Sequence, residues 1–199
     1  MTTSSSATSG STRAAGGKRE RLVDAAGQLF HQQGVERTTL AEIATAADVP
    51  LGNVYYYFKT KDDIVNAVVD SRLAALDGMF AGLEQAHRSP GTRLKAFFDE
   101  LAGQAVLISQ FGCPFGSLCS ELEKRAQGAD HHAAQLMQTP IDWAERQFRD
   151  MGRANPRALA VQLIAAYQGA AVLTHALGSP DLMSREARRV DRWVDSLRK

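Results

Sequence analysis

The chain has 199 residues, of which 44% are hydrophobic, enough for one large or two small domains with an apolar core. Its 23 Lys and Arg nearly cancel its 22 Asp and Glu, which leaves a net charge of +1. This balance excludes a protein that binds nucleic acid through a generally basic surface. Any surface that binds nucleic acid must therefore be local. The two cysteines, Cys113 and Cys119, form no disulfide framework and favour a reduced, cytoplasmic chain.

The first residues are typical of a tail rather than of a signal sequence. Residues 1–17 are rich in Ser, Thr, Gly and Ala, so we expect a disordered N-terminal tail. No charged segment followed by an apolar one opens the chain, and no uninterrupted apolar run is long enough to span a bilayer, so we expect no membrane partner. Arg13, Lys18, Arg19 and Arg21 are either solvated tail charges or an arm that touches phosphates.

Two helices are predicted next. The first begins at Lys18 and stops at Gly34. Its apolar positions recur at three- and four-residue steps: Leu22, Ala25, Ala26, Leu29 and Phe30. Thr39 and Glu42 have the spacing of a capping box and open a second, short helix, which Pro50 ends.

A third short helix is predicted over about 51–58, and Thr60 with Asp63 repeats the capping spacing at the start of a long fourth helix. Beyond it, helical periodicity predicts further helices over about 92–110, 115–127, 130–151 and 156–176, and a final one with apolar steps of four and three residues. No stretch alternates as a strand would. The fold class is therefore all-α, with about nine helices.

Three short helices with a tight break between the second and the third are typical of a helix-turn-helix, in which the third helix enters the major groove. The runs Thr38-Thr39-Leu40-Ala41-Glu42-Ile43-Ala44 and Gly52-Asn53-Val54-Tyr55-Tyr56-Tyr57-Phe58-Lys59 closely resemble the signature of the tetracycline-repressor (TetR) family. The resemblance covers roughly 18–69. It implies a DNA-binding domain over 18–78, with the motif at about 41–60, and a helical ligand-binding and dimerisation domain over 79–199.

The resemblance also implies roles for single residues. Thr39 would present its backbone amide to a phosphate, Tyr55 and Lys61 would contact phosphates, and an amide such as Asn53 can bind adenine N6 and N7 together. The residues expected to contact DNA are Thr38, Thr39, Leu51, Gly52, Asn53, Tyr55, Tyr56, Tyr57, Lys59 and Lys61.

The three consecutive tyrosines have a simpler interpretation, that they pack the small domain. Consecutive helical residues point about a third of a turn apart, so at least one of them must be exposed. Phe58 and Val54 are expected in the core. Two positions depart from the family pattern: Ala41 stands where many members carry Arg or Lys, and Pro50 where a Ser or Thr cap is usual.

For the C-terminal half, the resemblance implies a ligand pocket and a homodimer built from the last two helices. A two-fold dimer would place the two recognition helices about 34–36 Å apart on a near-palindromic operator in double-stranded DNA. The apolar steps of the last two helices fit either this interface or an intramolecular core stripe. The dimer residues expected are Leu163, Tyr167, Ala170, Thr174, Met183, Ala187, Val190 and Val194.

The expected pocket has no cluster of charge, which favours a neutral or hydrophobic effector. Its residues are Phe98, Leu101, Phe111, Cys113, Phe115, Trp143, Gln147, Tyr167 and His175. The segment 112–122 resembles one found in a subgroup that includes N-ethylmaleimide-responsive, electrophile-sensing repressors. Cys113 would precede a helix N-terminus, where the helix dipole favours a thiolate. Cys113 is therefore either a sensor thiol or a small buried apolar residue.

Asp130, His131 and His132 are adjacent and lack the spacing of metal ligands, and no nucleophile–base pair stands out. We therefore expect no cofactor and no enzyme, with a small helical enzyme as the rival interpretation. The main prediction is a cytoplasmic, nucleoid-associated regulator, a repressor released from its operator by a small molecule. The alternative is a thiol-based electrophile or redox sensor acting through Cys113.

Overall fold

The computed structural model describes residues 17–125 and 131–197, and within these ranges it contains ten helices and no strand. They are α1 Lys18–Gln33, α2 Leu40–Ala46, α3 Leu51–Tyr57, α4 Lys61–Ala86, α5 Pro90–Ala102, α6 Ala105–Phe111, α7 Pro114–Arg125, α8 His131–Asp150, α9 Pro156–Leu177 and α10 Asp181–Ser196. The all-α prediction is confirmed. The tail predicted over 1–17 lies outside the described residues except for Gly17, and so does Asp130.

Local sequence signals define the ends of the N-terminal helices. The Thr39 hydroxyl accepts the Glu42 amide at 3.2 Å, and the Glu42 carboxylate accepts the Thr39 amide at 2.7 Å. Thr60 and Asp63 form the same reciprocal pair. Both predicted capping boxes are thus confirmed. Gly34 ends α1 with φ of +86°, a backbone angle that residues with a Cβ rarely adopt.

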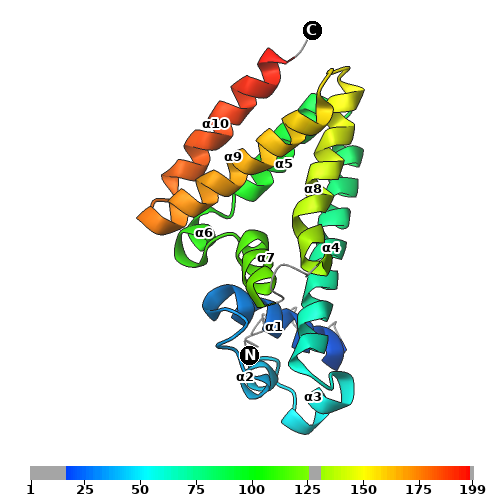
Figure 1. Ribbon diagram of the computed structural model, residues 1–199, viewed down its shortest axis with the longest axis vertical. Helices are drawn as coiled ribbons and strands as arrows, with labels where there is room; N and C mark the ends of the chain where they lie inside the picture. The colour runs from blue at the N-terminus through cyan, green and yellow to red at the C-terminus, as the bar shows by residue number, and fades with distance from the viewer. Residues whose placement is uncertain (1–16, 126–130, 198–199) are drawn as a thin grey trace, which may run out of the picture.

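The helices pack around two apolar cores. The long helix α4 contributes residues to both, and it extends from α3 toward the opposite end of the molecule (Figure 1). The head, which we define as α1 to α3 with the first turns of α4, encloses one core that also takes in residues of α7 and α8. The second core lies among α4, α5, α8, α9 and α10 at the other end of the molecule. Ile64 to Val69 of α4 belong to the first core, and Leu76, Phe80 and Leu83 to the second. The predicted domain boundary at 78 therefore falls within a helix that packs in both.

One predicted helix, over about 92–110, is wrong as a single element. The structure ends α5 at Ala102 and begins α6 at Ala105, with Gly103 as the C-cap of α5. Gly103 donates its amide to the Asp99 carbonyl, and an added Cβ would lie 3.3 Å from the Glu100 carbonyl oxygen. The apolar periodicity runs through the break because α5 and α6 both place apolar side chains in the second core.

Among the described residues, one helix, α9, is long and apolar enough to cross a membrane by length and composition. Its buried residues form part of the second core, and α9 packs against α6, α8 and α10. Packing on three sides accounts for much of its apolar character. The apolar side chains on its remaining face are considered below.

Candidate nucleic-acid interface

The α2–α3 pair exposes one face of α3 because its other face fills the first core. Val54 and Phe58 are buried, as predicted, and so is Val49 in the turn. The turn between the helices uses Asp48 in the left-handed region, with φ of +51°. Pro50 is the N-cap of α3 and provides no side-chain cap, in agreement with the departure noted in the sequence.

All three consecutive tyrosines are solvent-exposed, so the interpretation that they only pack the domain is wrong. Tyr56 is 75% exposed, Tyr55 50% and Tyr57 36%. The Tyr56 and Tyr57 rings meet edge to face, with centroids 4.9 Å apart. Leu51 and Gly52 are also exposed, and Asn53 is half-buried. An exposed aromatic and amide surface on a short helix fits groove and phosphate contact.

Two lysines flank this surface, each held by a backbone carbonyl. Lys59 Nζ donates to the Tyr55 carbonyl at 2.9 Å, and Lys61 Nζ donates to the Glu36 carbonyl at 3.2 Å. An ammonium group has three donors, so each lysine keeps protons available for a phosphate oxygen. The carbonyls thus position both charges at the edge of α3 without neutralising them.

Two of the predicted DNA contacts need correction. Thr38 is fully buried, and its hydroxyl donates to the Gly34 carbonyl at 2.7 Å, so its side chain holds the α1–α2 loop together rather than facing DNA. The amide of Thr39 is occupied by Glu42, and so it is not free for a phosphate. Arg37, beside Thr38, is exposed and was not among the predicted DNA contacts. Its positive charge in the loop before a capped helix is the sequence feature that would have made it a candidate.

The capping carboxylates stay ionised at neutral pH. Amide hydrogen bonds lower the pKa of Glu42, chiefly the one from Thr39, and lower the pKa of Asp63, chiefly the one from Thr60. Each carboxylate therefore keeps its cap in place well below neutrality.

Helix α7 holds the head through polar contacts. The Glu121 carboxylate accepts the amides of Val35 at 2.9 Å and Glu36 at 2.8 Å. Arg125 pairs with Glu36 at 2.6 Å and with Asp62 at 3.0 Å. These contacts join the loop before α2 and the start of α4 to the C-terminal half.

Replacing Glu121 with alanine is expected to lower the free energy of unfolding by about 1 kcal/mol and to alter DNA affinity, because two amides lose their acceptor. Urea denaturation measures the first effect and DNA titration the second. Ser120→Ala, an exposed neighbour on α7, is the control. Unchanged stability and unchanged affinity in the Glu121 variant would show that α7 does not hold the head.

His31 makes a second contact between the head and the C-terminal half, with Nε2 2.8 Å from the Gly112 carbonyl oxygen. Burial lowers the pKa of His31 below its ordinary 6.5, the bond to Gly112 opposes this, and Arg72 and His175 add repulsion. The unfolded chain therefore binds the proton more readily, and stability is lost as the pH falls below 6.5.

Thermal unfolding followed from about pH 7.5 down to about pH 5.5 should show this loss, which His31→Gln should reduce because glutamine does not titrate. Gln can still donate to the Gly112 carbonyl, so the contact itself is kept. An equal loss in the variant and in the unaltered chain would assign the effect to another group.

The predicted ligand residues do not all converge. Leu101, Phe115 and Tyr167 line an interior cavity of about 20 Å³, enough for about one water molecule. Phe98 and Trp143 are packed core residues, with the Trp143 ring stacked on Phe80 at 4.6 Å. The other predicted side chains are engaged elsewhere: Gln147 accepts from Arg93, Phe111 meets His31 edge to face, and the ring of His175 lies against the Ser109 carbonyl.

Cys113 immediately precedes α7, as predicted, but it is only 5% exposed. Its sulfur accepts the Gly116 amide at 3.3 Å, the Tyr167 hydroxyl at 3.5 Å and the Gln168 side-chain amide at 3.6 Å. Burial raises the pKa of Tyr167, which keeps this hydroxyl a neutral donor. The thiol is therefore packed and hydrogen-bonded rather than open to solvent.

Most of the predicted dimer residues face the interior of the protomer, and their assignment to an interface is wrong. The second core contains five of them: Leu163, Tyr167, Met183, Val190 and Val194. Thr174 is buried as well. Ala187 is half-buried and lines an open pocket between α5 and α10, and Ala170 lines an outer groove between α9 and α10. The outward face of α9 instead carries exposed apolar side chains: Val161, Val172, Leu173 and Leu177.

Comparison with known proteins supports the assignment of the head. Residues 22–68 match the family described as "Bacterial regulatory proteins, tetR family". The HTH-type transcriptional regulator TtgR of Pseudomonas putida is 26% identical over 188 residues, 89% of this chain and 88% of that protein. The HTH-type transcriptional repressor DhaR of a Mycobacterium species is 27% identical, over 76% of this chain and 79% of its own length.

The fold is shared with solved structures as well. A TetR transcriptional regulator from Legionella pneumophila superimposes with a TM-score of 0.80 at 20% identity, over 94% of this chain and 100% of that one. The α2–α3 pair, its exposed recognition surface and the match over residues 22–68 agree. The chain is a TetR-like, DNA-binding transcriptional regulator of the helix-turn-helix type.

Proposed function

We propose that this regulator is a cytoplasmic, homodimeric repressor that binds a near-palindromic operator and is released by a small molecule. The observation that carries the proposal is the surface of α3, where three exposed tyrosines lie beside Lys59 and Lys61. Leu51, Gly52 and Asn53 are the proposed base-edge contacts, and Tyr55, Tyr57, Lys59, Lys61 and Arg37 the proposed phosphate contacts. Tyr56, the most exposed of the three tyrosines, can serve either role.

The outward face of α9 and α10 supports the proposed dimer. A groove of about 590 Å³ lies between these helices, floored by small residues of α9 such as Ala165 and Gly169 and edged by Arg185, Glu186 and Arg189 of α10. Val172 and Leu173 are 65% and 53% exposed. An apolar centre with a charged rim is the usual composition of a protein interface. A second copy of the chain would bury these side chains.

The interior cavity favours a neutral or hydrophobic effector because apolar side chains dominate its lining. At about 20 Å³ it has no room for an organic molecule, so such an effector must displace side chains between α5, α7 and α8. The effector acts only through its differential affinity for the operator-bound and the released states of the protein. Because α7 lies between this cavity and the head, it is the proposed route of coupling.

The first test is a titration of the purified protein with its upstream intergenic DNA across a salt series. Sequence-specific binding that weakens steeply with salt is expected from a phosphate-anchored regulator. Equal affinity for this DNA and for random duplex at every salt concentration would count against specific recognition of that DNA. The same titration with candidate effectors tests release.

Thiol sensing through Cys113 is not favoured by the burial of this side chain. Thiol sensing can still be tested directly. The Cys113→Ser variant should bind the operator but should not be released from it by an electrophile such as N-ethylmaleimide. Release that persists unchanged in the variant would exclude Cys113 as the sensor.

A further inference from the structure

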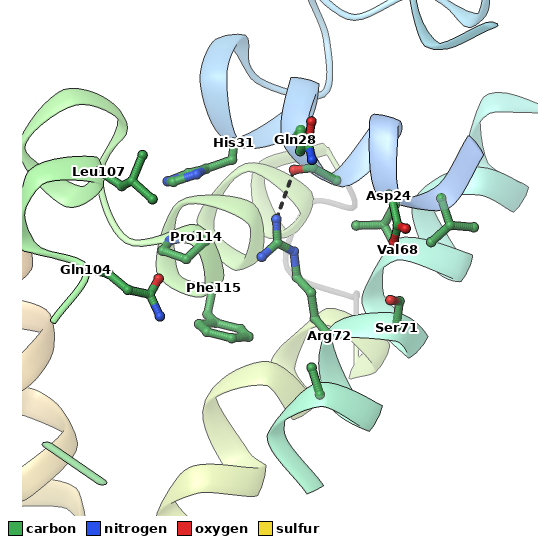
Figure 2. Close-up of a pocket in the computed structure, with 13 residues that line it drawn as sticks. Asp24, Gln28, His31, Val68, Ser71, Arg72, Gln104, Leu107, Pro114 and Phe115 are labelled. Atoms are coloured by element: carbon green, nitrogen blue, oxygen red, sulfur yellow. Dashed lines mark hydrogen bonds between the residues drawn. The ribbon is translucent and has the colours of Figure 1, made fainter. Parts of the chain in front are cut away.

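An open cleft of about 400 Å³ lies where the head meets the C-terminal half, apart from the interior cavity, with which it shares only Phe115. Figure 2 shows its walls, which come from α1, α4, α6 and α7. Leu107, Pro114 and Phe115 form an apolar side, and the amides of Gln28 and Gln104 lie around it.

The guanidinium of Arg72 extends from α4 into this cleft toward α1 (Figure 2). It donates one hydrogen bond, from Nη2 to the Gly27 carbonyl at 3.0 Å, and lies over the Phe115 ring at 5.6 Å. Its Nε is buried and has no hydrogen-bond partner among the described residues. Within the same residues, no carboxylate lies within ion-pair distance of it, and Asp24, the acid in the cleft lining, makes no pair with it.

One carbonyl bond and one ring contact offset only part of the cost of removing this positive charge from water, because no carboxylate among the described residues pairs with it. Arginine remains protonated in proteins, so the charge is not removed by loss of a proton. A partly buried, unpaired charge is destabilising unless an opposite charge compensates it. Carboxylates compensate guanidinium well because charge-assisted N–H···O bonds are among the strongest in proteins. The rest of the lining, apolar on one side, suits the non-polar body of an organic anion.

We propose that the cleft is a binding site for a small organic carboxylate, whose charged end pairs with Arg72 and whose apolar body lies against Leu107, Pro114 and Phe115. Arg72 Nη1 makes no hydrogen bond to the described residues and is the first donor to the ligand. The site is separate from the interior cavity, and a ligand in it touches the head through α1 and the C-terminal half through α6 and α7.

From this position the ligand can regulate DNA binding, an inference that rests on the proposed function. The cleft lies beside the His31–Gly112 contact. A carboxylate bound between α1 and α7 therefore shifts the balance between head positions if it binds one of them more tightly. If DNA binds the same head position as the carboxylate, each ligand raises the affinity for the other. If DNA binds the other head position, each ligand lowers the affinity for the other.

Calorimetric titration of the full chain, without DNA, tests the site itself. The probes are 2-naphthoate and octanoate, each compared with its uncharged primary amide. At least one carboxylate is expected to bind saturably, and at least about tenfold more tightly than its amide, as one lost charge-assisted contact implies. Failure of both carboxylates to bind up to their solubility limits overturns the proposal, and so does equal binding of acid and amide.

Arg72→Met keeps an apolar stem and removes the charge, and it should weaken carboxylate binding by about tenfold or more. Arg93→Met is the matched control, because Arg93 is also partly buried and also donates to a backbone carbonyl, that of His87, at a different place. Thermal unfolding of both variants reports their folding. Undiminished binding in folded Arg72→Met overturns the proposal.

A second pair of variants keeps the test decisive if Arg72→Met does not fold. Ala75 is exposed in the cleft lining, one turn from Arg72 on α4. Ala75→Glu supplies an internal carboxylate and should block the ligand, whereas Ala75→Gln adds nearly the same volume without charge and should block it far less. Equal binding by the two variants contradicts a charge-based site.

These titrations contain no DNA, so they separate the two proposals. Carboxylate binding without any operator binding would leave the Arg72 site standing and remove the repressor function. Operator binding without carboxylate binding would remove the Arg72 site and leave the repressor function standing.

Discussion

Replacing Tyr55 and Lys61 together with alanine is expected to reduce operator affinity at least about a hundredfold at low salt, since hydrogen bonds to charged groups contribute about 1.5–3 kcal/mol each. Tyr55 is half-exposed on α3 and Lys61 begins α4, and neither supports the core. Among the described residues the Lys61 ammonium donates to the Glu36 carbonyl and forms no ion pair, so its loss leaves no buried charge. The fold and the dimer should therefore survive.

The salt dependence of operator binding distinguishes the loss of phosphate contacts from a general loss of folding. Lys61→Ala alone should reduce the slope of log affinity against log salt by about one for each protomer bound. Arg188→Ala, an exposed arginine on α10, is the control and should leave the slope unchanged. An unaltered slope and affinity in the double variant would mean that DNA meets another surface.

Replacing Val172 and Leu173 together with aspartate is expected to convert the proposed dimer to a monomer. Both side chains lie on the outward face of α9, 65% and 53% exposed. The aspartates should therefore reduce the folding stability of the isolated protomer very little. In a dimer they would be buried without partners. A monomer also loses the second recognition helix, and operator affinity should fall by about a hundredfold or more because two linked sites bind far more tightly than one.

Light scattering during size-exclusion chromatography measures the dimer, and Leu163→Ala provides the contrast. Leu163 is fully buried in the second core, so its truncation should cost about 2–5 kcal/mol of folding stability while the dimer persists. If the α9 aspartate variant remains a dimer, or if Leu163→Ala dissociates it with the protomer still folded, the outward face is not the interface.

The dimer residues illustrate a limit of periodicity. Met183, Val190 and Val194 repeat at helical steps, and the repeat correctly predicts an apolar stripe on α10. A stripe gives the same pattern whether it faces another helix of its own chain or a second chain. The structure shows these side chains against the second core. The partner of an apolar face is a property of the assembled fold.

What the sequence determined by itself was local. Residues a few positions apart determine both capping boxes, the glycine stop of α1, the short helix α3 and the core roles of Val54 and Phe58. Their hydrogen bonds and spacings can therefore be inferred from short stretches of sequence.

Tertiary structure alone decided which distant side chains meet. Arg72 faces the Gly27 carbonyl across 45 positions, Cys113 meets Tyr167 across 54, and Glu121 caps amides 86 and 85 positions away. Burial, cavity shape and the pairing of charges follow from how whole helices pack, and many packings share one periodicity. The cleft at Arg72 and the outward face of α9 could be recognised only once the helices were placed together.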